Sequence, residues 1–472
     1  MVRRVPWFAI TVAKLLAASV ACVACAAYAA CSAAIVTEAK PAGPVHDPDH
    51  VRGELPSRET RRNELAELRR ALDAMYAHRA AKLARYRLDE QAIFRDAETS
   101  LLAATSWLAY DRALYAALAA FHDGHLTYRP PSTAAPSRGY TSFRLGLGTT
   151  VAHGHLLIVE TDPGSDVANA GTKPGDEVTA IDGKPVTDVL AAQVALRSDA
   201  RPESAHVAFA KTWTSALYPK GTAPRVRTID IAPHDGSAAL HVTIKPRLAA
   251  SAKHDAIAIA HVGDIAIVTL RSLEGGTVRA AAIDTVLAEA RGSHAIVIDL
   301  RGNRGGIGKV GYRVVADLAE GTASLGTYRV LAAPETLARR PMWKDLAAES
   351  DGFSSVQHLT VDALPHKYVG KLAVVTDAGC ISTCEQVTAA LRADIGAIVV
   401  GETTGGSSGA PVSVTLPASR GTVQIPTWNL LAADGRPIED DGVVPDVDVA
   451  ATADALAQQI DRPLQTAIDR IR

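Results

Sequence analysis

Residues 372–392 read LAVVTDAGCISTCEQVTAALR, which is an apolar run followed by a glycine-containing turn and a helical pattern. The run at 372–376 is apolar without alternation, which is typical of a strand buried on both faces. Similar apolar runs occur at 265–270, 295–300 and 397–400, with helical patterns at 280–290 and 385–392 between them. Alternating strands and helices predict an α/β core from about residue 256 to residue 472, with its functional site at the strand ends.

The turn after the 372–376 strand carries Ser382. This serine would lie at the start of a helix, where free N–H groups and the helix dipole stabilise negative charge. Two roles are open for it. It fits a helix cap to which Glu385 reaches back in a capping box, and this segment alone favours that role. Alternatively it is a nucleophile, and the amide of Thr383 helps to bind an oxyanion.

Two glycine-containing loops follow other predicted strands. The loop at 299–306, DLRGNRGG, lets backbone N–H groups face one point and so suits an anion or a developing oxyanion, although it lacks the lysine of a phosphate-binding P-loop. The loop at 401–409 contains GGSSG, which formally matches a nucleophile elbow. An elbow must lead from a strand into a helix, whereas residues 411–417 read as another strand, so we reject this match.

A small helical domain is predicted for residues 57–135. Apolar residues recur there at helical spacing, as in Leu65, Leu68 and Leu72. The last helix leads into the sequence HDGHL, in which Gly124 suits a left-handed helix cap.

A second domain, predicted for residues 140–248, reads as short strands separated by turn signals. The sequence AGTKPGDEVTAIDGK at 170–184, together with a glycine loop that precedes it, resembles a PDZ domain. That resemblance implies a groove for an extended peptide, whose terminal carboxylate the loop amides would hold. The alternative is a small barrel with glycine turns. The peptide-binding loop consists of Leu145, Gly146, Leu147 and Gly148.

The first residues predict export. Arg3 and Arg4 precede an uncharged stretch at 15–37, so we interpret residues 1–30 as a secretory signal and 31–56 as a polar linker. An uncleaved anchor or a lipid on Cys31 is the alternative, and either would tether the protein to a membrane. We expect an exported protein, periplasmic or associated with the cell envelope. The HDPDH sequence of the linker is not expected to bind metal, because metal ligands need a packed shell to fix them.

The composition is that of a globular protein, because 47% hydrophobic and 21% charged residues permit a buried core. Lys and Arg number 49 against 51 for Asp and Glu, and no long basic run stands out, so nucleic acid is not an expected partner. Cys380 and Cys384 are the cysteines outside the N-terminal region. They either bridge in an oxidising compartment or remain small buried side chains.

Four motifs occur in the order seen in the C-terminal processing peptidases and their tricorn-core relatives. They are DLRGNRGG at 299–306, Ser-x-x-Glu at 382–385, VVGET at 399–403 and GVVPD at 442–446. The resemblance extends over nearly everything from residue 143 onward, including the PDZ-like segment ahead of the core. It implies a crotonase-like core that hydrolyses peptide bonds with Ser382 as the nucleophile.

The resemblance also assigns a base. Processing peptidases pair the serine with a lysine in the loop after Gly-Glu-x-Thr, but Ser407 stands at that position, so a Ser–Lys dyad is not available. Tricorn-core enzymes instead use a histidine from the N-terminal helical part and a glutamate just before the Gly-Val-x-Pro-Asp motif. His125 and Glu439 hold those positions here. A second serine of tricorn core, just before the histidine, is Gly124 in this chain.

The expected chemistry follows from these residue types. Neutral His125 would take the proton of Ser382, and Glu439 would fix the imidazole tautomer. The amide of Thr383 and one further glycine amide would bind the oxyanion, and the sequence does not choose between Gly305 and Gly306. Two of these roles have other candidates in the sequence. His122 is a second candidate for the base, and Asp440 and Asp441 are further candidates for the acid.

We therefore predict an exported serine peptidase that acts on polypeptides, uses a PDZ-like domain to capture them and requires no metal or nucleotide. The alternative is a catalytically inactive protein that binds peptides or apolar ligands on the same fold. That alternative would gain if His125 lay far from Ser382. An acyl-CoA enzyme is disfavoured, because such sites do not need this serine turn.

Overall fold

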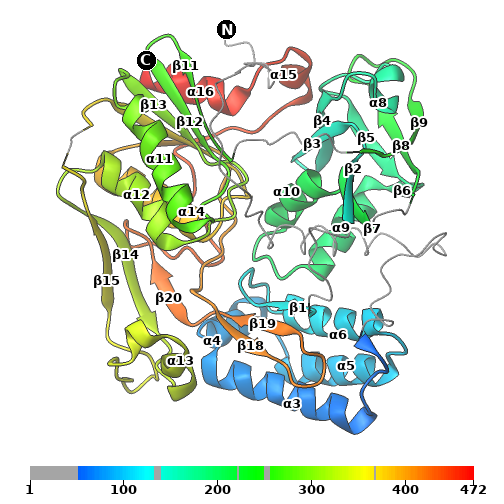
Figure 1. Cartoon of the computed structure of the whole chain (residues 1–472), viewed down its shortest axis with the longest axis vertical. Coiled ribbons are helices and arrows are strands. Elements are labelled where there is room, and N and C mark those ends of the chain that lie inside the picture. The colour runs from blue at the N-terminus through cyan, green and yellow to red at the C-terminus, as the bar shows by residue number, and fades with distance from the viewer. Residues whose placement is uncertain (1–51, 132–139, 220–222, 249–255, 366–367) are drawn as a thin grey trace.

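The computed structural model describes residues 52–131, 140–219, 223–248, 256–365 and 368–472, and the predicted signal and most of the linker lie outside this part of the chain. The described chain forms three bodies that surround a common junction (Figure 1). We call them the helical body, the middle body and the core body. No helix among the described residues is long and apolar enough to cross a membrane.

The helical body consists of α3 (Arg58–Met75), α4 (Arg79–Tyr86), α5 (Glu90–Ala103) and α6 (Trp107–Ala119). Its apolar core contains Leu68, Leu72 and Leu114, as the helical spacing predicts. The body also receives a hairpin from far along the chain. Strand β1 (Thr127–Arg129) pairs with β19 (Thr422–Ile425), which pairs with β18 (Val412–Thr415). The hairpin lies on the helices in Figure 1, and its Val423 and Ile425 join their core.

The middle body is built on an antiparallel sheet of order β3-β4-β5-β8-β9, with β6 (Lys184–Pro185) paired to β5. Its strands are β3 (Leu147–Ala152), β4 (His155–Thr161), β5 (Glu177–Ile181), β8 (Arg227–Ala232) and β9 (Leu240–Ile244). Helices α8 (Asp166–Asn169), α9 (Val186–Leu196) and α10 (Pro202–Thr212) accompany it. A smaller sheet joins β10 (Arg247–Leu248), β2 (Tyr140–Arg144) and β7 (Ser215–Pro219).

The core body contains a six-stranded sheet of order β11-β12-β13-β16-β17-β21. Strands β12 (Ile265–Leu270), β13 (Ala295–Asp299), β16 (Lys371–Thr376), β17 (Ile398–Gly401) and β21 (Val447–Asp448) are parallel, and β11 (Ile257–Val262) is antiparallel to β12. The four apolar runs of the sequence are therefore neighbouring buried strands, which confirms the predicted α/β class.

Helices cover both faces of this sheet. One apolar cluster joins it to α11 (Gly276–Ala290), α12 (Gly308–Leu318) and α14 (Thr383–Ile395), and another joins the opposite face to α16 (Arg462–Ile471). Because both faces are covered, the strands have no polar alternation. A second sheet of order β15-β14-β20 extends from the core body beside the helical body (Figure 1). Its strands are β14 (Thr322–Val330), β15 (Gln357–Asp362) and β20 (Trp428–Leu431), and the short helices α13 (Pro334–Arg339) and η1 (Pro341–Trp343) belong to the same body. Helix α15 (Ala453–Ala457) packs through Leu456 on β3 and β4 of the middle body.

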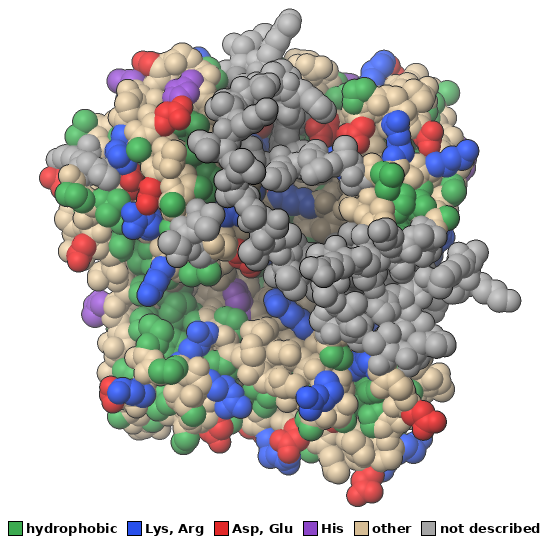
Figure 2. Space-filling model, viewed as in Figure 1, with side chains coloured by type: hydrophobic (Ala, Val, Ile, Leu, Met, Phe, Trp, Pro, Cys, Tyr) green, Lys and Arg blue, Asp and Glu red, His purple; other side chains and the backbone are tan. Residues whose placement is uncertain are grey.

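The three bodies leave a hollow between them. Figure 2 shows this hollow near the middle of one face, with basic side chains visible inside it. The loops at the carboxyl ends of the parallel strands lead toward the same region, which is where the sheet topology predicts the functional site.

Candidate active site

Ser382 occupies a tight turn between β16 and α14. Its backbone has φ 61° and ψ −125°, a combination that non-glycine residues rarely adopt and that is found where surrounding contacts impose it. The Ser382 N–H donates to Glu385 Oε2 at 2.9 Å, as the predicted capping box requires. The Ser382 hydroxyl lies 3.1 Å from Nε2 of His125. Ser382 is thus the first residue before the helix and also faces an imidazole.

A disulfide joins Cys380 to Cys384 and so spans the Ser382 turn. Both cysteines are fully buried among the apolar side chains between the sheet and its covering helices. Of the two states that the sequence left open, the structure has the bridged one. The bridge limits how far the ends of the turn can separate.

Glu385 connects the Ser382 turn to the 401–409 loop. Its buried carboxylate accepts hydrogen bonds from Thr404 Oγ1 at 2.6 Å and from the N–H groups of Gly406 and Ser407 at 2.8 and 3.0 Å, in addition to that of Ser382. Burial raises the pKa of Glu385 to about 8, although these hydrogen bonds act in the opposite direction. One side chain therefore holds the positions of Ser382 and Ser407 relative to each other.

His125 reaches the Ser382 turn from the helical body. It lies between α6 and β1, and its backbone N–H donates to Asp123 Oδ1 at 2.9 Å. Burial lowers the pKa of His125 to about 4, so the imidazole is neutral at pH 7. Its rival His122 points elsewhere, because the His122 ring stacks on Tyr86 with 4.4 Å between ring centres.

The second ring nitrogen of His125 does not face Glu439. Nδ1 lies 2.8 Å from Oγ of Ser407. The Glu439 carboxylate instead accepts the N–H of Ser408 at 2.7 Å and forms an ion pair with Lys82 at 2.6 Å. The contact that the sequence analysis assigned to Glu439 is therefore made by Ser407, because the buried ammonium of Lys82 holds the carboxylate beside it.

The two other candidate acids, Asp440 and Asp441, also form ion pairs. Asp440 forms an ion pair with Lys82 and accepts the hydroxyl of Tyr86 at 2.8 Å. Asp441 forms an ion pair with Arg85 at 2.8 Å. Both cations come from α4, so this pair of aspartates holds the helical body against the core body.

A buried charged cluster lies behind His125. It contains His78, Lys82, Asp123 and Glu439, and His78 Nδ1 lies 2.8 Å from Asp123 Oδ2. Burial disfavours the charge of His78, but the carboxylates of Glu439 and Asp123 outweigh it and raise the pKa of His78 to about 9. Burial and the Asp123 carboxylate raise the pKa of Glu439.

Three members of this cluster have ligand atoms close enough together to hold a metal ion, namely His78, Asp123 and Glu439. The ammonium of Lys82 already contacts Glu439, and His78 shares a proton with Asp123. A metal would have to displace both interactions. The donor set is therefore satisfied as ion pairs and does not fit a resident metal.

The oxyanion candidates lie beside the Ser382 turn. The N–H of Gly305 donates to Asn303 Oδ1 at 2.9 Å and is therefore occupied. Gly306 is fastened to the turn, because its carbonyl oxygen accepts the Thr383 hydroxyl at 3.0 Å. Its φ of 143° and the 2.5 Å from a built Cβ to the Leu273 backbone require glycine. Gly306 and Thr383 therefore remain as the candidate oxyanion donors.

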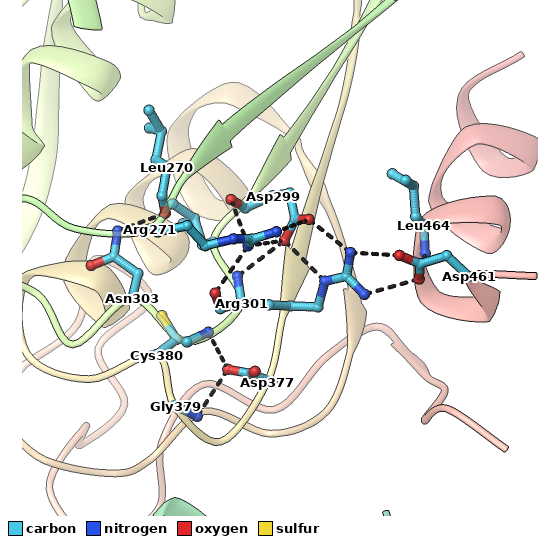
Figure 3. Close-up of polar contacts among 12 residues, drawn as sticks. Leu270, Arg271, Asp299, Arg301, Asn303, Asp377, Gly379, Cys380, Asp461 and Leu464 are labelled. Atoms are coloured by element: carbon cyan, nitrogen blue, oxygen red, sulfur yellow. Dashed lines mark hydrogen bonds and ion pairs between the residues drawn. The ribbon is translucent and has the colours of Figure 1, made fainter. Parts of the chain in front are cut away.

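Ion pairs anchor the loop that carries these glycines (Figure 3). Asp299 at the end of β13 binds Arg271 through two hydrogen bonds of 2.8 Å and also binds Arg301, which reaches Asp461 before α16 at 2.8 and 2.9 Å. Asp377 joins the loop to the Ser382 turn by accepting the N–H groups of Gly302 and Gly379. The aspartate and the arginine of the DLRGN motif are therefore structural supports for the glycines that follow them.

The predicted peptide-binding loop lies in the middle body, where Leu145 precedes edge strand β3 and Leu147 and Gly148 begin it. Gly146 has φ 83°, and its carbonyl oxygen accepts the hydroxyl of Ser165 at 3.1 Å. Helix α10 packs along β3, and Thr149 Oγ1 donates to the Ala210 carbonyl at 2.8 Å. Trp213, which follows α10, also donates its indole N–H to Thr149 Oγ1 at 2.8 Å, so the helix is packed directly on the edge strand.

Sequence reasoning missed Ser407, Lys82 and His78 as members of the site. Ser407 entered the sequence analysis only as the serine of a rejected nucleophile elbow and as the residue in place of a lysine, and Lys82 and His78 lie on helical patterns without a motif. Gly124 was also misinterpreted. The left-handed residue after α6 is His122, with φ 52°, whereas Gly124 has a φ outside the left-handed region. Gly124 is required for space instead, because a built Cβ would lie 2.5 Å from Ser407 Oγ.

Comparison with known proteins agrees with the motif order. Residues 264–449 match the model of Peptidase family S41. No curated protein matches the sequence. Among solved structures, mature CPAF is 15% identical with a TM-score of 0.65 over 88% of this chain and 96% of that chain. Mature CPAF complexed with lactacystin is 16% identical, with the same TM-score over 88% and 97%. At this identity the likeness establishes the shared fold.

Proposed function

We propose that this chain, a serine-type peptidase whose residues 264–449 form a domain of Peptidase family S41, cleaves polypeptides with Ser382 as the nucleophile and His125 as the base. The observation that carries the assignment is the 3.1 Å contact between Ser382 Oγ and His125 Nε2, which joins residues 257 positions apart and from two bodies. Serine hydrolysis needs a neutral base within hydrogen-bond reach of the nucleophile, and the buried imidazole meets both conditions.

The proposed reaction begins when Ser382 Oγ attacks the scissile carbonyl carbon and its proton passes to Nε2 of His125. The amides of Thr383 and Gly306 bind the oxygen that becomes negative, in a site where a lost donor typically costs about 10²–10³ in rate. Collapse of the tetrahedral intermediate breaks the C–N bond, and His125 gives its proton to the leaving amine. Water, deprotonated by His125, then attacks the acyl ester, the bond between the acyl carbon and Ser382 Oγ breaks, and His125 gives its proton to Ser382 Oγ.

We also propose that the enzyme is exported. The uncharged stretch at 15–37, preceded by Arg3 and Arg4, supports a secretory signal. The Cys380–Cys384 bridge supports an oxidising compartment, because disulfides are rare where thiols are kept reduced. Fractionation of cells that produce the full chain would test this. Recovery of the protein in the cytoplasm with free thiols would contradict it.

Substrate capture by the middle body is the finer part of the proposal. The glycine loop before edge strand β3 and the contact of α10 with that strand support a PDZ-like groove that takes an extended peptide as an added strand. Peptides with a free terminal carboxylate should then have a lower KM than the same peptides amidated at that end. Equal KM values would show that the loop amides do not hold a carboxylate.

The catalytic assignment is tested by peptide hydrolysis. Ser382→Ala and His125→Ala should each lower kcat by at least about 10³-fold, because they remove the nucleophile or its base. Ser293→Ala is a matched control at a half-buried position between α11 and β13 of the core body and should retain wild-type activity. Hydrolysis that persists in Ser382→Ala would contradict Ser382 as the nucleophile, whereas a folded wild type that hydrolyses no peptide would favour the alternative of a non-catalytic binding fold. That alternative would gain from a large distance between His125 and Ser382, but the two side chains are in contact.

A further inference from the structure

The ring nitrogen of His125 that does not face Ser382 is Nδ1, and it contacts a hydroxyl. Nδ1 lies 2.8 Å from Ser407 Oγ, and Ser407 is only 1% exposed. We propose that Ser407 is the positioning residue of the active site and holds His125 in the tautomer that leaves Nε2 free to accept the Ser382 proton. This inference rests on the proposed function. It gives Ser407 the orienting role that the sequence analysis gave to a carboxylate.

The two contacts fit either tautomer, because a hydroxyl can donate or accept, and the reaction selects between them, since only a lone pair on Nε2 can take the Ser382 proton. If Nδ1 carries the proton, it donates to Ser407 Oγ, and Nε2 keeps a lone pair directed at the Ser382 hydroxyl. A hydroxyl at Nδ1 can also accept from the imidazolium that forms in the reaction. Negative charge near the ring is supplied separately by Asp123, whose carboxylate accepts the His125 backbone N–H.

Ser407 is itself fixed by backbone contacts. Its N–H donates to Glu385 Oε2 at 3.0 Å, and its carbonyl oxygen accepts the Ser382 N–H at 2.9 Å. The next residue, Ser408, donates its N–H to Glu439. Ser407 and Ser382 are therefore parts of one rigid assembly, into which the helical body delivers His125. The Glu439 carboxylate acts on the loop that carries Ser407, and only through that loop on the imidazole.

Gly124 provides the room for this arrangement. A Cβ built on Gly124 would lie 2.5 Å from Ser407 Oγ and 3.2 Å from Ser407 Cβ. A side chain at position 124 and the Ser407 hydroxyl would thus occupy the same space beside the imidazole. It follows that a hydroxyl supplied from residue 124 should be able to replace one supplied from residue 407. This exchange can be made by mutation.

The test compares Ser407→Ala with two double variants, Ser407→Ala/Gly124→Ser and Ser407→Ala/Gly124→Ala. Readouts are kcat and KM for an unstructured peptide and the rate of labelling by a fluorophosphonate. Ser407→Ala should lower kcat by about 10- to 100-fold and leave KM within about twofold, because tautomer control matters in the chemical step. The double variant with serine at 124 should have a kcat at least about tenfold higher than that of Ser407→Ala, whereas the double variant with alanine should not.

The two double variants differ by one hydroxyl and fill the vacated space almost equally. A loss caused only by packing would therefore be recovered by both, and that result would overturn the proposal even if Ser407→Ala is poorly folded. A kcat within twofold of wild type for a folded Ser407→Ala would overturn it as well. Wild-type labelling at Ser382 separates the two levels. With labelling intact in wild type and equal in Ser407→Ala, only the positioning role fails, whereas no wild-type labelling removes the proposed function and this inference together.

Discussion

The imidazole of His125 is enclosed by protein, and this burial sets the pH range in which it can act. Desolvation disfavours the imidazolium and lowers the pKa of His125 to about 4, against an ordinary value near 6.5. Asp123 and Asp199 favour the charged form but do not outweigh the burial. The enclosed base is therefore neutral, and ready to accept a proton, well below neutral pH.

The labelling rate at Ser382 should consequently remain high down to about pH 5 and fall as the pH drops through about 4. The sign follows because the base must be neutral, and a lowered pKa keeps it neutral at lower pH. Labelling by a fluorophosphonate between pH 3.5 and 8 measures this, within the range where circular dichroism shows a folded protein. A half-maximal rate near pH 6.5 would mean that His125 is solvated or is not the base.

Individual residues differ in how far the sequence could predict them. Ser382, His125 and Thr383 could be placed because motifs flank them, and the structure brings them together. Glu439 was assigned a contact with His125 that Ser407 makes, since a motif gives the order of residues along the chain but not the direction of a carboxylate. That direction depends on Lys82, a single buried ammonium from another body.

The element that supports catalysis is the glycine loop after β13. Its backbone is tied to the Ser382 turn through Asp377 and to α16 through Arg301 and Asp461. The sequence could identify this loop as an anion-binding concavity but could not choose its donor. The choice between Gly305 and Gly306 depends on the Asn303 side chain. Its Oδ1 accepts the Gly305 N–H, and its Nδ2 donates to the Leu270 carbonyl at 2.9 Å.

Gly306→Ala should lower kcat by about 10²-fold or more, because the added Cβ would push the loop from the Leu273 backbone and misplace the oxyanion donor. Gly171→Ala is the matched control. It imposes a comparable left-handed strain, with φ 85°, but in open space in the middle body. Steady-state kinetics and thermal midpoints should show a loss of activity confined to Gly306→Ala. Equal activities of the two variants would remove Gly306 from the oxyanion site.

The strands themselves were the most predictable elements. The four apolar runs matched buried parallel strands within one or two residues, because strands covered on both faces need no polar positions. The β18–β19 hairpin was not predicted as part of the helical body. Val423 pairs with Tyr128, and both Val423 and Ile425 pack on a core formed by residues about 300 positions earlier in the chain. The local sequence pattern contains no signal for such packing.

At the scale of the whole molecule, the proposed active site lies where the helical body meets the core body. The helical body supplies His125, and the core body supplies Ser382, Ser407 and the oxyanion loop. The buried cluster of His78, Lys82, Asp123 and Glu439 closes this junction. A buried charge is tolerated when its partners satisfy it, so the cluster ties the position of His125 to the electrostatics of the junction.

The His78 charge should make stability depend on pH. Because its folded pKa, about 9, exceeds its unfolded value near 6.5, its contribution is fully present below about pH 6.5 and is lost as the pH rises to about 9. The shift corresponds to about 3 kcal/mol. Thermal midpoints of wild type should therefore fall over this range more steeply than those of His78→Gln. His155→Gln, at an exposed ion pair of the middle body, should keep the wild-type slope, and parallel curves for wild type and His78→Gln would contradict the charged junction.

The central claim is that Ser382 is a nucleophile activated across the junction by His125. The most direct measurement is labelling of the full chain with a fluorophosphonate at pH 7, followed by mapping of the modified peptide. Labelling should give one adduct, on Ser382, that disappears in Ser382→Ala and forms at least about 10³-fold more slowly in His125→Ala. An adduct on another serine, or labelling of Ser382 at an unchanged rate in His125→Ala, would contradict it.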